Sequence, residues 1–164
     1  MVKKTFILYT RNFIFGSEDS LVSTVGLLAG IASAGVARRE ILISGIVLIC
    51  VEAFSMSVGS FLSETATEES SSKIVGKNST SIMASAIMFV SYSISGLIPL
   101  FPYFVMDTQH AFWWSIVASI VSLFILGYIS AKILKINVLK STLRMALIGG
   151  MAIGLGVVVG LLMK

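Results

Sequence analysis

The stretch EDSLVSTVGLLAGIASAG, residues 18–35, places two adjacent acids at the start of an apolar run that suits lipid. From Ser20 to Ala37 the chain has 18 residues without a charge. A helix needs about 17–25 largely apolar residues to cross the hydrocarbon core of a bilayer. The run therefore predicts a transmembrane helix. It also raises the question of why Glu18 and Asp19 stand beside it, since charge is costly inside hydrocarbon.

Similar runs recur along the whole chain. Of its 164 residues 56% are hydrophobic and 12% charged, and the mean hydropathy is +0.98, whereas a soluble domain carries about 25% charged residues. We therefore predict an all-α integral membrane protein with five transmembrane helices in a single domain, residues 1–164, and a short cytoplasmic loop over 64–77. The predicted helices cover about 10–37, 41–63, 78–106, 108–131 and 142–163.

The basic residues predict how the helices are oriented. If the N-terminus is cytoplasmic, nine Lys and Arg residues lie inside and three lie outside. An excess of positive charge on the cytoplasmic side is the rule for membrane proteins, so we expect an N-terminus inside and a C-terminus outside. The inside group is Lys3, Lys4, Arg11, Lys73, Lys77, Lys132, Lys135, Lys140 and Arg144, and the outside group is Arg38, Arg39 and Lys164. The pair Arg38–Arg39 runs against the rule.

The composition argues against several classes of function. The net charge of +4 is spread over short gaps between apolar runs, so it forms no stripe for nucleic acid. Cys50 is the single cysteine, which excludes an internal disulfide and a cysteine metal cluster. No nucleophile–base pair is evident, so an enzyme is not expected and no cofactor is predicted.

Glycines and prolines indicate how the helices pack. Small residues spaced by four positions let helix backbones approach closely in lipid, where no hydrophobic force drives helices together. Three such pairs are Gly26 and Gly30, Gly150 and Gly154, and Gly156 and Gly160. In GLIPLFPYF, residues 96–104, two prolines predict a break or bend near the outer end of the third helix.

Two intramembrane acids suggest an ion site. Helical periodicity puts Asp19 on the same face as Ser23, and it puts Glu52 on the same face as Met56 one turn later. No Lys or Arg lies at mid-depth in any predicted helix, so the acids need protonation or a bound cation. A thioether is a soft ligand that favours transition metals such as Fe²⁺, although a Met in an apolar helix is also a common gap-filler.

Such a site predicts an exchange of metal for protons. Without metal, burial and mutual repulsion favour the protonated form of paired carboxylates. A divalent cation must then displace those protons before it can bind. Metal flux in one direction coupled to proton flux in the other is the expected mechanism.

At these residues the sequence resembles the vacuolar iron transporter family. The resemblance covers all five predicted helices, and four segments carry it: FGSEDSLVSTVGLLAGIASAG at 15–35, AFSMSVGSFLS at 53–63, SGLIPLFPYF at 95–104 and LRMALIGG at 143–150. The matching positions are Gly16, Asp19, Ser55, Met56, Gly59, Ser63, Gly96, Pro99, Pro102 and Tyr103.

The resemblance implies a five-helix protomer that pairs into a homodimer and moves Fe²⁺, sometimes Mn²⁺, out of the cytoplasm in exchange for protons. It also implies that Asp19 and Met56 line the metal path. The short loop after Glu64 resembles a short form of the family, which lacks the glutamate-rich cytoplasmic metal-binding domain of eukaryotic members. This shortness and the small size of the chain favour a prokaryotic cell membrane over a vacuolar one.

The chain departs from the family pattern at two motifs. Ser20 follows Asp19 where the family has Gly, and Ser60 stands where the family has a Glu. We therefore expect Glu18, Glu52 and Glu64 to supply further carboxylates along the path. Two more acids, Glu68 and Glu69, either attract cations at the cytoplasmic mouth or form a solvated helix end.

His110 and the function class leave alternatives open. His110 is either an exit ligand or an interfacial polar residue, since a metal site needs several converging ligands. The predicted partners are a divalent metal ion, protons, the lipid bilayer and a second copy of the chain. The alternatives are a membrane assembly or accessory subunit without transport, and a manganese-specific exporter of the same fold.

Overall fold

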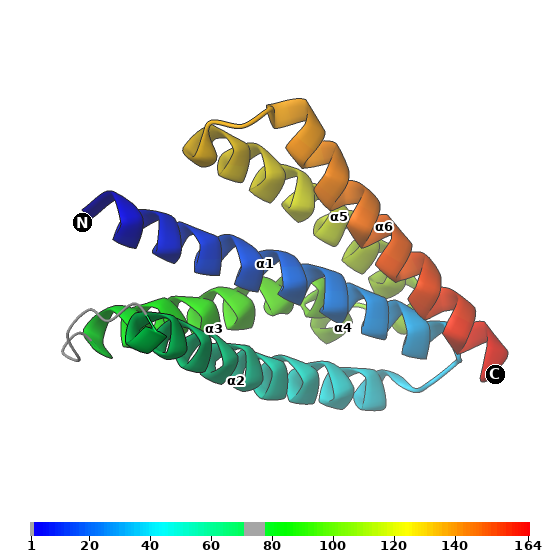
Figure 1. Cartoon of the computed structure of the whole chain (residues 1–164). Helices are drawn as coiled ribbons and strands as arrows, with labels where there is room; N and C mark the ends of the chain where they lie inside the picture. Colours follow the sequence, from blue (N-terminus) through cyan, green and yellow to red (C-terminus); the bar gives the residue numbers. More distant parts are fainter. Residues whose placement is uncertain (1, 71–77) are drawn as a thin grey trace.

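The computed structural model describes residues 2–70 and 78–164, and this part of the chain is helical without a strand. Five of its helices are long and apolar enough to cross a membrane, which confirms the predicted all-α fold with five candidate spans. The helices are α1 (Val2–Ser33), α2 (Arg38–Ser70), α3 (Asn78–Leu100), α4 (Pro102–Val105), α5 (Thr108–Leu134) and α6 (Val138–Leu162) (Figure 1).

Several helices run beyond the predicted bounds. Helix α1 begins at Val2 rather than near residue 10, and α2 continues to Ser70 rather than ending at residue 63. Both extensions carry charged residues, so a prediction based on uncharged runs leaves them out. Residues 64–70 of the predicted loop 64–77 are therefore helical, and residues 71–77 lie outside the described residues.

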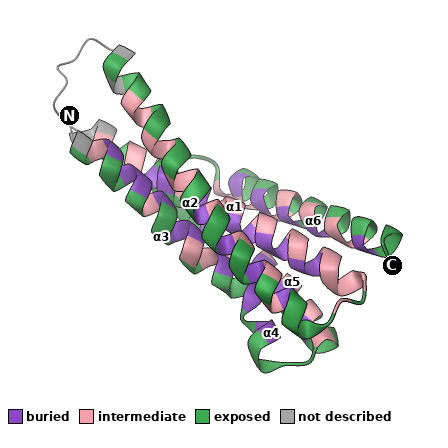
Figure 2. Cartoon of the chain, turned by 90° about the horizontal axis from the view of Figure 1, so that it is seen from below, coloured by how far each residue is buried: buried purple, intermediate pink, exposed green. Residues whose placement is uncertain are grey.

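Helix α1 is the centre of the bundle. It contacts α2, α3, α5 and α6, and 50% of its apolar segment is buried, against 17% for α6. Val25 and Leu28 have no exposed surface. In Figure 2 the buried residues gather where helices meet, and the outward surfaces are largely exposed. A central helix that carries acids can shield them from lipid.

The outer surface of the bundle is apolar. Large side chains such as Phe54 (66% exposed), Trp113 (63%) and Leu155 (69%) point away from the other helices. In water such a surface would drive aggregation, whereas lipid covers it without cost. The distribution of side chains therefore agrees with the predicted spans.

Helices α1 and α6 cross through their glycines. A methyl group added at Gly156 would overlap the carbonyl oxygen of Gly26, and one added at Gly160 would overlap that of Gly30. Within the described part of the chain, no atom stands within 4 Å of a methyl group added at Gly150 or Gly154. Two of the three sequence pairs therefore meet each other, and the third faces outward.

The prolines of α3 and α4 produce a helix break at Phe101. Pro99 is accommodated within α3, whereas Pro102 begins α4 and cannot donate a backbone hydrogen bond to the preceding turn. The hydroxyl of Ser115 on α5 donates to the carbonyl of Pro99 at 2.7 Å. This bond satisfies a carbonyl at the broken end of α3 and fixes the break against α5.

Arg38 secures the other side of this break. Its Nε donates to the carbonyl of Tyr103 at 2.6 Å, and its Nη2 donates to the carbonyl of Phe104. Both carbonyls lie in the short helix α4, where a cation matches the negative end of the backbone dipoles. The position of Arg38 thus has a structural cause that is independent of the distribution of charge between the two sides of the membrane.

Candidate metal site

A line of polar contacts joins α1 to α2 along the predicted cytoplasmic half of the bundle. Arg11 forms an ion pair with Glu64. Next to it, the Ser60 hydroxyl donates to the Oδ1 of Asn12 at 2.6 Å, and Asn12 is 2% exposed. Deeper in the bundle, the charges of Asp19 and Glu52 interact. We call these six residues the polar seam: Arg11, Asn12, Asp19, Glu52, Ser60 and Glu64.

The acids at the inner end of the polar seam are unpaired. Asp19 on α1 and Glu52 on α2 are both half-buried within apolar helices. Within residues 2–70 and 78–164, neither carboxylate has a hydrogen bond or an ion pair. Two neighbouring carboxylates without a cation repel each other, and their placement in a membrane span is costly. The structure therefore brings together the two acids that the sequence placed on separate polar faces.

Tyr92 is a member of this cluster that the sequence analysis missed. It lies on α3 with no exposed surface, and its hydroxyl is 2.8 Å from the hydroxyl of Ser23 on α1. Its carbonyl accepts a hydrogen bond from Ser20 at 2.6 Å, and its ring hydroxyl interacts electrostatically with Asp19 and Glu52. The one feature of the sequence that could have indicated Tyr92 is that it is a single tyrosine in the middle of an apolar helix, one turn before Gly96.

Met56 lies one helical turn beyond Glu52 on α2 and is half-buried. Its place in the sequence is between Glu52 and Ser60, both of which face α1. The thioether is therefore positioned along the same stretch of α2 as the polar seam. Its role as a metal ligand stays a prediction.

The other predicted acids occupy different surroundings. Glu18 interacts most strongly with Arg144 of α6, and more weakly with Asp19. Glu64 is held by Arg11 at the end of the polar seam, and Glu69 is exposed. The side chain of Glu68 lies outside the described residues. Of these acids, Glu18 is the one nearest to the unpaired pair, and its strongest charge partner lies on α6 rather than α2.

His110 forms a local pair at the start of α5. Its backbone N–H donates to Asp107 Oδ2 at 3.3 Å, and its Nδ1 lies 2.8 Å from Asp107 Oδ1. These hydrogen bonds, the side-chain one first, lower the pKa of the exposed Asp107 carboxyl. The arrangement is a helix N-cap, and the role of His110 as an exit ligand stays a prediction.

The described side chains form no complete set of metal ligands. Among the described residues there is no group of three or more His, Cys, Asp or Glu side chains that could hold a metal ion. Such an open site suits an ion that must leave again rather than a permanently bound one.

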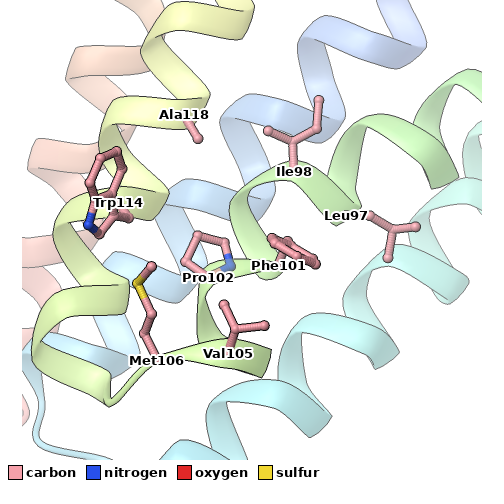
Figure 3. Close-up of a pocket in the computed structure, with 8 residues that line it drawn as sticks. All are labelled: Leu97, Ile98, Phe101, Pro102, Val105, Met106, Trp114 and Ala118. Carbon is pink, nitrogen blue, oxygen red and sulfur yellow. The ribbon is translucent and has the colours of Figure 1, made fainter.

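A separate cavity near α4 is apolar. It has a volume of about 460 Å³ and is an open pocket lined by residues of α3, α4 and α5 (Figure 3). Its lining residues are Leu97, Ile98, Phe101, Pro102, Val105, Met106, Trp114 and Ala118. The lining contains no carboxylate, unlike the polar seam.

Comparison with known proteins places these features in one family. The model of the VIT family matches residues 10–81 and 65–161. The chain is 26% identical over 153 residues to vacuolar iron transporter homolog 1 of Arabidopsis thaliana, which covers 87% of this chain and 76% of that protein. It is also 26% identical over 159 residues to vacuolar iron transporter homolog 5 of Oryza sativa subsp. japonica, with 90% and 76% covered. A third relative, homolog 2 of Arabidopsis thaliana, is 27% identical over 152 residues, with 87% and 77% covered.

Proposed function

The chain belongs to the VIT family, and from this premise we propose that it is a secondary transporter that exports divalent iron from the cytoplasm in exchange for protons. The relatives named above are vacuolar iron transporter homologs. The observation that carries the proposal is the pair of unpaired acids, Asp19 and Glu52, on facing spans. An assembly or accessory subunit has no need of two uncompensated carboxylates in its interior.

The choice of ion rests on Met56. Carboxylate oxygens alone suit Mg²⁺, Ca²⁺ and Mn²⁺, whereas a thioether beside them favours a softer ion. Iron is therefore the proposed substrate. A manganese-specific exporter of the same fold is the second candidate, and it is favoured if Met56 packs against its neighbours without reaching the ion.

Proton exchange follows from the surroundings of Asp19 and Glu52. Two carboxylates within membrane spans are costly unless a cation compensates their charge or protons neutralise them. A divalent cation compensates both charges and must displace the protons. The proposed orientation, with a cytoplasmic N-terminus and an external C-terminus, is the one that the basic residues predict. Arg38 no longer counts against this orientation, because it binds the carbonyls of α4.

A homodimer is supported by the open surface of α2. Ser55, Gly59 and Ser63 are exposed along one side of this span, and in the described part no atom lies within 4 Å of a methyl group added at Gly59. Hydroxyls facing hydrocarbon are poorly solvated, and small residues allow a second helix to approach closely. We expect a second copy of the chain to cover this stripe and to supply the ligands that one protomer lacks. The membrane is proposed to be a prokaryotic cell membrane.

The test is ion flux into liposomes that contain the purified chain. Uptake of Fe²⁺, Mn²⁺, Zn²⁺ and Co²⁺ is compared for the wild type and for Asp19→Asn, Glu52→Gln and Met56→Leu. We expect the two acid variants to lose at least about tenfold in uptake of every ion, since even outer-shell changes at metal sites cost that much. Met56→Leu should lower uptake of Fe²⁺ more than uptake of Mn²⁺.

Matched controls keep the test specific. Glu40→Gln removes an exposed acid at the start of α2, and Met151→Leu removes an exposed methionine of α6. Both should transport like the wild type. A pH-sensitive dye in the same liposomes should report protons moving against the metal. Wild-type rates in Asp19→Asn and Glu52→Gln, or metal flux that ignores an imposed pH gradient, would contradict the proposal.

A further inference from the structure

The turn between α5 and α6 presents three lysines at one end of the bundle. Lys132 lies in the last turn of α5, Lys135 is the residue that ends this helix, and Lys140 lies in the first turn of α6. Lys135 has a left-handed backbone with φ 55°, and the N–H of Ile136 donates to the carbonyl of Ala131 at 3.0 Å. This tight turn brings the ends of α5 and α6 together. We call Lys132, Lys135 and Lys140 the basic tip.

The charges of the basic tip are uncompensated. All three lysines are exposed, and none forms an ion pair within the described part of the chain. The sequence from residue 108 to residue 164 contains no Asp or Glu at all. The ammonium of Lys132 lies 5.4 Å from the centre of the Tyr128 ring, which orients it without neutralising it. The basic tip therefore attracts anions from outside the chain.

Exposed apolar side chains stand between these lysines. Leu134 is 40% exposed, Ile136 47% and Leu139 69%. They lie where two candidate spans end, Thr108–Leu134 and Val138–Leu162, which is the boundary between hydrocarbon and water. A soluble anion would neutralise the lysines and leave these side chains in water. A lipid covers both, because its phosphate and its acyl chains meet at this depth.

The surrounding helices leave the basic tip open. In Figure 1 the turn between α5 and α6 stands apart from the N-terminal end of α1 and from the ends of α2 and α3. Helix α6 meets α1 farther along, where Gly156 and Gly160 contact Gly26 and Gly30. Within the part of the chain that the structure describes, the turn itself therefore stands apart from the ends of α1, α2 and α3.

We propose that the basic tip binds the headgroup phosphates of anionic phospholipids, which hold the splayed end of α5 and α6 at the membrane boundary. Lysine ammonium groups near an anionic leaflet each favour binding by about fivefold. Three lysines on one turn therefore give a stronger preference for anionic over zwitterionic lipid than a single lysine gives. The exposed leucine and isoleucine side chains contact the adjoining acyl chains.

The experiment is a lipid competition on the full chain in detergent micelles. Phosphatidylglycerol and phosphatidylcholine are added in equal amounts, and native mass spectrometry counts the lipids that remain bound. We expect the wild type to retain phosphatidylglycerol preferentially. The triple variant Lys132→Gln, Lys135→Gln, Lys140→Gln should lose this preference by at least about tenfold. The triple Lys→Arg variant at the same positions should keep it, since the positive charges remain.

Two controls separate a local site from a general effect of charge. The variant Lys3→Gln, Lys4→Gln, Lys164→Gln removes the same net charge elsewhere and should bind phosphatidylglycerol like the wild type. An equal loss in this control would overturn the proposal. High salt should weaken the wild-type preference, and a preference that ignores salt would also overturn it, even if the glutamine variant fails to fold. Displacement of the lipid by inorganic phosphate alone would show that the basic tip binds free phosphate and would reject a lipid site.

Discussion

The hydroxyl of Tyr92 lies 2.8 Å from the hydroxyl of Ser23, where the buried face of α3 meets the side of α1 that carries Asp19. Through this contact a residue of the third span reaches the acids of the first two. The backbone carbonyl of Tyr92 also accepts a hydrogen bond from the side-chain hydroxyl of Ser20, so two hydrogen bonds join α1 to α3 at this residue. The position of Asp19 therefore depends on three helices rather than two.

Tyr92→Phe tests this dependence. The variant keeps the ring that fills the bundle and removes the hydroxyl that bonds Ser23. A buried hydrogen bond contributes about 1 kcal/mol, so the metal concentration for half-maximal uptake should rise by about fivefold with a small change in maximal rate. The measurement is Fe²⁺ uptake into liposomes as a function of concentration. Tyr128→Phe, on the exposed side of α5, should leave both parameters unchanged, and an equal effect of the two variants would contradict the assignment.

Gly156→Ala tests the crossing of α1 and α6. The added methyl group would overlap the backbone carbonyl of Gly26, which cannot move aside as a flexible side chain would. Overpacking of a tight contact costs about 1–3 kcal/mol, so thermal unfolding in detergent should shift to lower temperature. Gly154→Ala, on the open side of α6, should be neutral or raise stability, because Ala favours helix over Gly by up to about 1 kcal/mol. Similar unfolding temperatures for the two variants would rule out a close crossing.

Arg38→Ala tests the support of the broken α3–α4 segment. Arg38 donates to two backbone carbonyls of α4, and part of this bonding is exposed to solvent. Hydrogen bonds from charged groups contribute about 1.5–3 kcal/mol when shielded, and we expect the lower end of that range after solvent screening. Arg39→Ala removes the neighbouring charge and should have little effect on the unfolding temperature. If both variants are equally unstable, net charge rather than the carbonyl contacts of Arg38 is responsible.

The start of α5 should respond to acid. Hydrogen bonds from His110 lower the pKa of Asp107, so the folded state holds this carboxyl ionised more readily than the unfolded state. Its contribution to stability is therefore complete above the unfolded pKa of about 4 and is lost as the pH falls through the lowered value. The difference in unfolding temperature between the wild type and Asp107→Ala should shrink below about pH 4. A difference that stays constant into strong acid would show that the charge of Asp107 is unimportant.

The five spans were predictable because lipid imposes a single requirement, a long apolar run, on each of them. The ends of the spans were harder to predict. Helix α1 passes through Arg11 and Glu18, whose charges interrupt the run but find partners in Glu64 and Arg144 once the helices pack. The charge pattern of one segment gives no information about an oppositely charged residue that another helix supplies.

The candidate site shows the same limit. Helical spacing placed Asp19 and Glu52 on polar faces, and the fold brings these faces together. Tyr92 was missed because its importance comes from a contact between α3 and α1, and nothing in its own neighbourhood marks it. The three glycine pairs look alike in the sequence, and tertiary contacts alone distinguish the two that cross from the one that faces outward.

The crossing of α1 and α6 also limits how the bundle can change shape. Gly26 and Gly30 press backbone against backbone in the C-terminal half of α1, whereas Asp19 lies near the middle of the helix and Asn12 lies in its N-terminal half. A helix that is held by a close contact near one end can tilt about that contact, and its other end then moves farthest. If α1 tilts to open and close the proposed metal path, its displacement is therefore greatest at Arg11 and Asn12. The displacement is smallest where the glycines touch.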